Sequence, residues 1–581
     1  MNTDKVRYEV DLRDTAGHRI VVVAEISVVA PLPDGSAEVG LPSWTPGSYM
    51  IRDYARHVTN FKVIGGEGVK VAKDRWRVQV PPSRRIKISY EAFAYERSVR
   101  TNWLSDSHAF IAPAALFIDE TSAFSGRGAR VSRPCEVTFK LPKGWAADGL
   151  VAHRSNKWIA PSYAALVDSA FLAGKLRKIE FRAARVAHQL VAAGDDASML
   201  DLKAIAHDAK AAIESSASLF GGVPYKNFKF LAYTAPQSEG MGGLEHRDGC
   251  ALQISANATA TTEKRLALAG LVAHEHFHAW NVKRLADQAL VEPDLSVETH
   301  TSLLWFHEGF TSYYDDLVLV RSGVMPRASY LNLIADLQNL LATHRGPLSQ
   351  SLYESSLDSW IKFYKKNDEW RSASVSYYQQ GALAALALDL EARVAGRGSV
   401  DALMRALWAR HKLGFPLTET TWLETAIPIF GDLALRWHAD WISGAKHSNV
   451  AKLLKPFGVD AKPKDSNSHR RGWLGIVTRL DGTRCFVEEA LAHGPGRAVG
   501  ISPRDEIIAV SGRRVSGDLE AALAAFTPGA KIPVTVFRGE RLLTFEVTLT
   551  SHPAPPVQLT LRSRQTAREK VLLDAWLGTA G

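Results

Sequence analysis

The alternation of apolar and polar residues predicts strands in the first third of the chain. Between residues 7 and 186, short runs with a period of two are separated by Pro and Gly, and the clearest lie at 19–30, 76–80, 85–95 and 135–141. A series of short strands with turn residues between them is typical of an antiparallel β domain, to which we assign residues 1–186.

A change to helical periodicity follows this domain. Apolar residues recur every three or four positions over 198–220, Gly221 and Gly222 end that helix, and 228–233 is typical of a strand. These elements indicate a second, mixed domain, to which we assign residues 187–324.

Two further helices complete the second domain. The first is largely apolar, extends over 263–280, is capped by Thr261 or Thr262 and is closed by basic residues. The second extends over 302–320 and ends before Gly323.

The rest of the chain is predicted to hold a helical domain and a small β domain. Residues 325–455 are almost entirely helical in pattern. A polar linker begins at 461, strands and one short helix return over 466–552, and the tail, 553–581, contains one more helix. The sequence therefore predicts a multidomain α+β fold.

Composition places the chain among soluble globular proteins. Its 581 residues are too many for one core, and 46% hydrophobic and 23% charged residues are ordinary values. The net charge of +9 is spread along the chain, and no basic cluster interleaves with aromatic residues. Nucleic acid is therefore not an expected partner.

The sequence gives no sign of export or membrane insertion. No stretch reaches the roughly 18 apolar residues of a membrane span, and residues 1–12 run into a strand-like alternation without an apolar export core. We expect a cytoplasmic protein without a membrane partner; a periplasmic location would require that an export signal had been trimmed from the chain.

The three cysteines, Cys135, Cys250 and Cys485, are far apart and odd in number. They indicate neither a disulfide framework nor a cysteine-based metal site. A metal site in this chain must therefore be built from His and acidic residues.

Residues 274–278 have the sequence HEHFH, which matches the zinc-peptidase pattern His-Glu-x-x-His. On a helix, His274 and His278 lie one turn apart on the same face and can bind one tetrahedral Zn2+. Glu275 is turned sideways, where it can act as general base on a zinc-bound water. His276 lies on another face, so we expect it to pack in the core.

Glu308, in the sequence WFHEGF at 305–310, completes a set of two His and one Glu ligands. The fourth position of the metal is left to water or substrate, as in catalytic zinc sites. Asp315 lies on the same helical face as Glu308 and could orient an imidazole.

Chance is the alternative explanation of the metal motif. A lone His-Glu-x-x-His arises in roughly a few per cent of such chains, and its histidines then only satisfy hydrogen bonds in the core. The helix-forming, largely apolar residues around 274–278 favour the metal site instead.

Several stretches resemble one known family. They are 41–49 (LPSWTPGSY), 52–56 (RDYAR), 240–246 (GMGGLEH), 279–284 (AWNVKR) and 377–381 (YYQQG). Together they make the chain similar to the glycyl aminopeptidase family of gluzincins, distant relatives of the aminopeptidase N and leukotriene A4 hydrolase group. The resemblance implies a β domain, a thermolysin-like catalytic domain over 187–324 and a helical domain, with Glu308 as the third zinc ligand.

Two site residues follow from this resemblance. Gly242, Gly243 and Glu245 match an aminopeptidase motif whose Glu holds the free amine of the substrate, although the Asn of that motif is His246 here. A glycine-rich strand edge would also let a peptide backbone approach and pair. The alternative is a solvated Glu in a turn, with Glu239 taking the role.

Tyr378 stands at the place of the family tyrosine that stabilises the oxyanion. The lysine usual in that motif is Gln380 here. The neighbouring Tyr377 is the alternative donor, and both could instead be core aromatics.

The segment after the linker looks like a bacterial-type PDZ domain. The matching stretches are 472–476 (GWLGI), 496–501 (GRAVGI) and 505–512 (DEIIAVSG). Backbone amides of the loop Trp473, Leu474, Gly475 and Ile476 would hold the carboxylate of a peptide or protein C-terminus, and the helix near 518–526 would border the groove. The alternative is a structural appendage that binds nothing.

The function that these features predict is a zinc-dependent aminopeptidase. It would remove N-terminal residues from peptides, small ones if the family preference for Gly and Ala holds. The alternatives are a zinc endopeptidase, an epoxide hydrolase with the same zinc residues, and a non-catalytic PDZ-bearing adaptor or chaperone.

Overall fold

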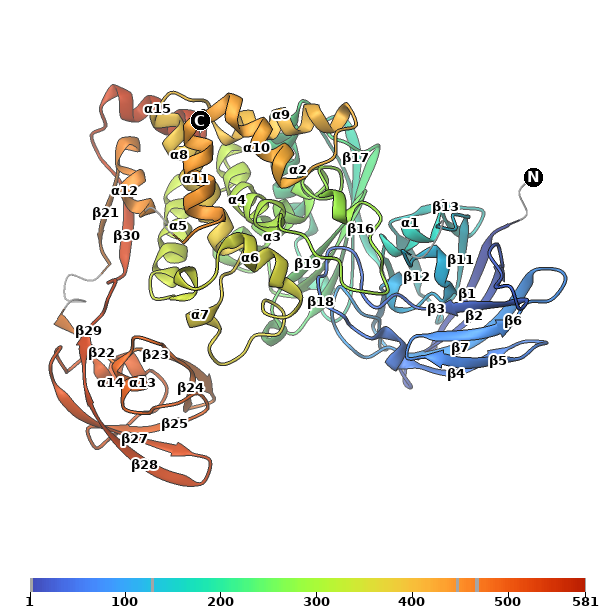
Figure 1. Cartoon of the computed structure of the whole chain (residues 1–581), viewed down its shortest axis with the longest axis horizontal. Coiled ribbons are helices and arrows are strands. Elements are labelled where there is room, and N and C mark those ends of the chain that lie inside the picture. Colours follow the sequence, from blue (N-terminus) through green and yellow to red (C-terminus); the bar gives the residue numbers. More distant parts are fainter. Residues whose placement is uncertain (1–3, 127–129, 446–448, 465–469, 580–581) are drawn as a thin grey trace. The chain divides into compact units, whose positions relative to one another are not determined.

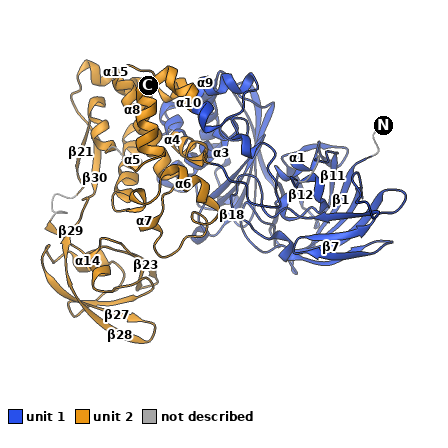
Figure 2. Cartoon of the chain, in the orientation of Figure 1, with its two compact units in different colours: residues 1–301, 314–325, 404–422 blue, residues 302–313, 326–403, 423–581 orange. Residues whose placement is uncertain are grey.

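The computed structural model describes residues 4–126, 130–445, 449–464 and 470–579. The chain divides into two compact units: residues 1–301, 314–325 and 404–422 form the first, and residues 302–313, 326–403 and 423–581 form the second (Figure 2). Within the described ranges, no helix combines the length and the apolar composition needed to cross a membrane.

Unit 1 begins with the predicted β domain. Its largest sheet has seven strands in the order β13-β14-β11-β1-β2-β7-β4 (Figure 1). The bounds of these strands are Ala152–Arg154, Lys157–Ala160, Cys135–Lys140, Val6–Asp14, Arg19–Ser27, Arg85–Phe93 and Val58–Val63. Every second residue of β1 is buried, so the period-two prediction is confirmed here. One pair departs from the prediction, because β1 and β11 run parallel.

Two four-stranded sheets complete this domain. One has the order β10-β3-β6-β5, and the other has the order β12-β15-β9-β8. The bounds are Asp119–Glu120, Ser36–Gly40, Arg75–Gln79 and Gly68–Ala72 for the first sheet, and Ala146–Gly149, Phe171–Gly174, His108–Ile111 and Trp103–Leu104 for the second.

The second sheet system of unit 1 carries the catalytic motifs. Five strands, β16 (Arg177–Ala183), β17 (Val186–Ala193), β18 (Asn227–Ala235), β20 (Gly249–Ser255) and β19 (Gly242–His246), lie in that order. The three central strands are parallel to one another, and β19 is antiparallel at the edge. Because β16 pairs with β17, the sheet extends across the boundary expected after residue 186.

Two helices belong to this sheet system, α2 (Leu202–Phe220) and α3 (Thr262–Phe277), and they contact each other. Helix α3 begins where predicted, because Thr261 accepts a hydrogen bond from the Lys264 amide at 3.3 Å. It ends at Phe277 rather than at residue 280, and consecutive turns follow to residue 284. His278 is therefore the C-cap of α3.

Unit 2 contains the predicted helical domain. Its longer helices are α5 (Arg327–Leu341) and α8 (Gln379–Val394), and short ones include α6 (Leu352–Leu357), α7 (Trp370–Ala373), α11 (Asp432–Trp437) and α12 (Val450–Leu453). Three further helices, α4 (Thr311–Arg321), α9 (Val400–Lys412) and α10 (Glu419–Phe430), have residues in both units. Helix α8 is buried almost all round, as expected for a central helix.

A π-helical segment, η7 (Trp305–Phe310), runs directly into α4. The sequence predicts an ordinary helix here, because the wider turn leaves no mark in the apolar pattern. A Cβ on Gly309 would lie 2.6 Å from the Cα of Gly381, so the backbones of η7 and α8 touch. This close approach brings the residue next to Gly309, Glu308, towards the beginning of α8.

Unit 2 also holds a small β module with its own core. Its strands follow the order β23 (Ile476–Asp481), β24 (Arg484–Ala490), β25 (Glu506–Val510), β27 (Lys531–Arg538) and β28 (Arg541–Thr548). A short strand, β26 (Arg513–Arg514), pairs with β25, and two short helices are α13 (Pro495–Ala498) and α14 (Leu519–Leu523). The first four residues of the predicted PDZ domain, 466–469, lie outside the described residues.

This module is inserted into the helical domain. The chain approaches it through β21 (Val459–Pro463) and leaves it through β30 (Val557–Leu561), and these two strands pair with each other. The predicted terminal helix follows as α15 (Ala567–Leu577), capped by Thr566 and Glu569. Its Trp576 is fully buried, so the described part of the tail, residues 553–579, belongs to the fold.

Candidate active site

The two predicted metal-binding imidazoles face each other at the end of α3. Nε2 of His274 lies 3.1 Å from Nε2 of His278. The Nδ1 atoms have other partners: Asp315 Oδ2 at 3.0 Å for His274 and the Asn281 carbonyl at 2.7 Å for His278. A carbonyl only accepts, so Nδ1 of His278 carries the proton, and with Asp315 ionised the same holds for His274. Both Nε2 atoms then present lone pairs to the same point.

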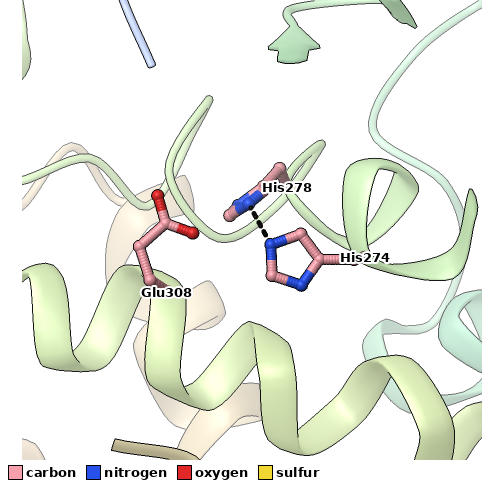
Figure 3. Close-up of side chains that lie close together, drawn as sticks. All are labelled: His274, His278 and Glu308. Atoms are coloured by element: carbon pink, nitrogen blue, oxygen red, sulfur yellow. Dashed lines mark hydrogen bonds between the residues drawn. The ribbon is translucent and has the colours of Figure 1, made fainter. Parts of the chain in front are cut away.

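A metal ion fits this arrangement. Two lone pairs at 3.1 Å repel each other unless a cation lies beside them, and two nitrogens bound to zinc at about 2.0–2.1 Å in tetrahedral geometry are about 3.3 Å apart. One ligand atom from each of His274, His278 and Glu308 lies within 4.8 Å of the others (Figure 3). Two imidazole nitrogens and one carboxylate form the donor set of many catalytic zinc sites.

A turn with one unusual backbone conformation follows His278. Val282 has φ of 129°, a value that β-branched residues rarely adopt. The turn presents the Asn281 carbonyl to His278 and places Lys283 near Glu245, with its Nζ 3.8 Å from Oε1. Strain of this kind persists where the surroundings enforce it, which is frequent at functional sites.

Glu275, the predicted general base, is buried beneath strand β19. A Cβ built on Gly243 would overlap the carboxylate of Glu275, whereas a Cβ on Gly242 would meet nothing within 4 Å. Of the two glycines predicted to bind substrate, Gly243 is thus required by packing on Glu275. The structure gives no packing reason for Gly242.

Glu245 lies on the same edge strand and is only 4% exposed. One carboxylate oxygen each of Glu245 and Glu275 and one ring nitrogen of His278 lie within 4.8 Å of one another. The structure therefore brings the predicted amine-binding residue, the predicted base and a predicted metal ligand together.

Charged residues that sequence reasoning missed surround Glu245. Lys283 donates to Asp168 at 2.8 Å, and His246 Nδ1 lies 3.3 Å from the same carboxylate oxygen. Burial opposes ionisation of Asp168, but the Lys283 ammonium and the hydrogen bonds from His246 and Lys283 lower the pKa of Asp168 to about 2. These contacts join residues far apart in sequence, so no local pattern points to them.

A loop of the N-terminal β domain also contacts Glu245. Gly47 has φ of +83°, and a Cβ at this position would lie 2.5 Å from Glu245 Oε1. Gly47 and Glu245 line a cavity of about 470 Å³ within unit 1, together with Trp44, Tyr49, Asp168 and Lys283 among others. The stretch 41–49 stands out in the sequence, but its spacing does not say what it packs against.

Tyr378 lies at the N-cap of α8 in unit 2, half-buried, and Tyr377 beside it is fully buried. Burial, the nearby Glu308 carboxylate and Tyr364 hold the pKa of the Tyr378 phenol well above its ordinary value. The hydroxyl therefore stays protonated at neutral pH and can donate a hydrogen bond. The two rings lie 4.9 Å apart, and Phe363 packs on both.

His276 is fully buried and turned away from the metal ligands. Its Nε2 lies 2.6 Å from the hydroxyl of Tyr225, which lies 3.0 Å from Nε2 of His188. Burial lowers the pKa of His276 well below its ordinary value, so the ring is neutral. This histidine is a packed core residue, as its helical face predicts.

The predicted carboxylate-binding loop lies at the start of the β module. Trp473 belongs to β22 (Gly472–Trp473), which pairs with β29 (Thr550–Ser551), Leu474 is buried in the module core, and Ile476 begins β23. Gly475 has φ of +72°, and a Cβ here would lie on the backbone of Gly494. The carbonyls of Leu474 and Gly475 accept hydrogen bonds from the amides of Gly496 and Leu491.

The site as a whole suggests a class of protein. An edge strand beside a His-Glu-x-x-His helix, with a glutamate oxygen within 4.8 Å of both imidazoles, could hold the metal ion of a metallopeptidase. Two family profiles match the chain: M61 glycyl aminopeptidase over residues 267–384, and Peptidase M61 N-terminal domain over residues 7–175. These matches support a metallo-aminopeptidase.

One solved structure has the same fold. An aminopeptidase N family protein from Idiomarina loihiensis is 27% identical, with a TM-score of 0.88 over 98% of this chain and 100% of that chain. An M1 zinc metallopeptidase from Deinococcus radiodurans is 15% identical, with a TM-score of 0.46 over 77% of this chain and 94% of that chain.

A curated relative matches only a short segment. The serine endoprotease DegS from Salmonella typhimurium (strain 14028s / SGSC 2262) is 39% identical over 70 residues, 12% of this chain. The match spans 20% of the length of DegS.

Proposed function

We propose that this protein is a zinc aminopeptidase that releases single residues from the free amino end of peptides. The observation that carries this proposal is the position of Glu245, whose carboxylate lies within 4.8 Å of Glu275 and His278 at the edge of a sheet. A buried carboxylate beside the base and a metal ligand is suited to bind the α-ammonium of a substrate. The family resemblance adds a preference for small residues, Gly and Ala.

The protein residues have distinct parts in this proposal. Zinc held by His274, His278 and Glu308 would lower the pKa of a water molecule to about 7 and polarise the scissile carbonyl. A carboxylate oxygen of Glu275 takes the proton from the water and passes it to the leaving amine. The Tyr378 hydroxyl donates to the carbonyl oxygen as negative charge develops there.

Strand β19 orients the substrate. It lies at the edge of its sheet, so its outer backbone groups can pair with an extended peptide. The missing side chain at Gly243 leaves room for the Glu275 carboxylate beside the strand with which the peptide pairs. Glu245 and Asp168 both lie close to the Lys283 ammonium, and the Glu245 carboxylate offers a substrate ammonium a partner of opposite charge.

A panel of aminoacyl arylamides tests this function. Free glycyl and alanyl substrates should be cleaved, their acetylated forms should not, and a chelator should abolish turnover until zinc is restored. Cleavage of acetylated substrates or of internal peptide bonds would favour the endopeptidase. Chelator-resistant turnover would contradict a metallopeptidase altogether.

The β module is a candidate for a second role, the binding of peptide C-termini. Strand β23 lies at the edge of its sheet, and the loop 473–476 precedes it, which is the geometry that strand addition needs. Fluorescent peptides with a free or an amidated C-terminus distinguish this role from that of a structural module. Selective binding of the free form is expected.

A further inference from the structure

The β module of unit 2 forms hydrogen bonds with the segment that leads to Tyr378. The central contact is Glu489 on β24, which is 2% exposed. Its Oε1 accepts from the amide of Ser372 at 3.1 Å and from the hydroxyl at 3.0 Å. Its Oε2 accepts from the amide of Arg371 at 3.2 Å and lies 3.4 Å from Nη1 of the same residue. One buried carboxylate thus binds two consecutive backbone amides of α7.

The other described contacts between the module and this segment are a hydrogen bond from the Ala492 amide to the Ser372 hydroxyl at 3.3 Å and exposed ion pairs. Arg497 pairs with Glu369 at 2.9 Å, and Arg504 pairs with Asp368 at 2.9 Å. Solvent-exposed pairs of this kind stabilise a fold little. The position of the segment therefore depends mainly on Glu489, because buried amides that lose their acceptor must find another or the backbone must move.

Two routes connect this contact to Tyr378. The first is the backbone between residues 372 and 378, which is held at Val375, where the amide donates to Gln350 at 2.9 Å and the carbonyl accepts from Ser355 at 2.6 Å. The second is a row of rings. Trp370 lies 6.1 Å from Phe363, and Phe363 stacks on Tyr378 at 5.4 Å.

We propose that Glu489 is a positioning residue for the active site: it fixes α7 and the ring row so that the Tyr378 hydroxyl stands where the reacting carbonyl oxygen needs a donor. The proposal rests on the proposed function, in which Tyr378 is that donor. It makes the β module a structural support of the catalytic machinery, whether or not the module also binds peptides.

Steady-state kinetics on the full chain test this role with Glu489→Gln. The amide keeps the size of the side chain but replaces one acceptor oxygen by an NH2 group, which cannot accept from Arg371 or Ser372. We expect kcat to fall on the order of tenfold to a hundredfold, the range that a displacement of up to about 1 Å costs. KM, zinc content and melting temperature should stay close to those of the unmodified protein.

Glu488→Gln is the matched control. It makes the same charge change at the adjacent residue, whose side chain is 48% exposed and lies 3.6 Å from Arg371 Nη2, without a contact to the backbone of α7 among the described hydrogen bonds. Turnover should be unchanged. If Glu488→Gln and Glu489→Gln lose turnover equally, charge alone is responsible and the positioning role is overturned.

A double variant that combines Glu489→Gln with Tyr378→Phe tests the positioning role of Glu489 separately from the proposed function. If Glu489 acts through the Tyr378 hydroxyl, Glu489→Gln should cause little further loss once that hydroxyl is gone. Full activity of Tyr378→Phe alone would refute the donor role in the proposed function. Additive losses, or an unchanged kcat in Glu489→Gln with Tyr378→Phe inactive, would overturn the positioning role only.

A folding defect in Glu489→Gln would not end the test. Ser372→Ala removes the hydroxyl that donates to Oε1 and accepts from the Ala492 amide, and it leaves both backbone amides in place, so it disturbs the same contact mildly. A fall in kcat with unchanged KM and zinc content in this variant supports the proposal. An unchanged kcat in a folded Ser372→Ala, together with an unfolded Glu489→Gln, would show that the contact is structural and overturn the proposal.

Discussion

Gly243 shows how one missing side chain can set the geometry of a base. The Glu275 carboxylate occupies the space that a Cβ at residue 243 would need, so β19 lies directly on the helix that carries the base. The neighbouring Gly242 has free space around the same position. The two glycines form a natural pair for mutation.

Gly243→Ala should lower kcat on the order of a hundredfold, because the added methyl displaces the carboxylate of Glu275. Gly242→Ala should leave kcat within a factor of a few. Arylamide kinetics and zinc analysis of both proteins check the prediction. Equal losses in the two variants would mean that backbone flexibility of the strand matters rather than space beside Glu275.

Substitutions of the metal ligands and of the base should have different effects on zinc content and kcat. His274→Ala, His278→Ala and Glu308→Ala should each lose zinc, because a site with two of three protein donors binds the metal weakly. Glu275→Gln should keep about one zinc per chain and lose about 10²- to 10⁴-fold in kcat, the usual contribution of a general base. Atomic absorption and kinetics on the same preparations measure both quantities. Full turnover in Glu275→Gln would exclude it as the base.

Glu245→Gln should weaken catalysis on free aminoacyl substrates. The loss in kcat/KM corresponds to roughly 2–5 kcal/mol, because one partner of a buried charge pair is removed. Activity on an acetylated substrate, however slow, should hardly change. A loss that is equal on both substrates would assign Glu245 a structural role.

Glu239→Gln is the control for this prediction. Glu239 is the alternative amine-binding residue, but its side chain is 38% exposed and pairs with Arg97 at 2.6 Å. We expect its substitution to leave kcat/KM nearly unchanged on free substrates. A selective loss in this variant would transfer the amine-binding role from Glu245.

At the residue scale, the sequence predicts which side chains of one short motif lie together in space. The spacing of His274 and His278 is enough to predict that the two imidazoles lie together, since His274 lies in the last turn of α3 and His278 is the C-cap of the same helix. Asp168, Lys283 and Gly47 could not be predicted, because they reach Glu245 from segments between 38 and 198 residues away in the chain. Only tertiary packing brings such residues together.

At the scale of elements, periodicity predicts the type of most helices and strands and their position within a few residues. Helix α2 and strands β2, β7 and β11 lie where the pattern places them, and α5, α8 and α9 lie in the segment 325–455 that the pattern predicts to be helical. The pattern fails where it carries no information: a parallel pair such as β1 and β11 alternates like an antiparallel one, and a π-helix such as η7 repeats like an α-helix.

The contact between η7 and α8 leads to a prediction about these two elements. Gly309→Ala places a methyl group against the backbone of Gly381, and overpacking of this kind costs about 1–3 kcal/mol. We expect a lower melting temperature and a reduced kcat, since Glu308 and Tyr378 lie on the two elements forced apart. Differential scanning fluorimetry and kinetics check this. Unchanged values for both would show that the helices can separate without consequence.

At the scale of the whole molecule, the connection of the β module differs from the linear order of domains that the sequence suggests. The chain returns to the helical domain through β30 and α15. There, the ring centroid of Trp576 lies 5.5 Å from that of Phe457 and 5.9 Å from that of Tyr330. Arg327 also pairs with Asp574 at 2.7 Å. The last residues therefore stabilise the helical domain.

Two deletions test whether the β module is inserted into the helical domain or is a terminal appendage. Truncation after residue 552 removes β30 and α15 and should abolish soluble expression, because it exposes the pocket of Trp576. Excision of residues 470–552 with a short linker should leave a folded, zinc-containing protein whose kcat is reduced by the loss of Glu489. Circular dichroism melts and zinc analysis check the outcome. A stable truncated protein would contradict the structural role of the tail.

The ribbon of β21 and β30 has a consequence for how such a chain can be rearranged. Pro463 and Val557 are paired residues of antiparallel strands, so the two points of attachment are roughly 5 Å apart. Any domain whose own ends lie close together meets the same geometric condition. At this ribbon, one module could thus be exchanged for another by gene fusion. The path of the remaining chain, from the metal ligands to the terminal helix, would stay the same.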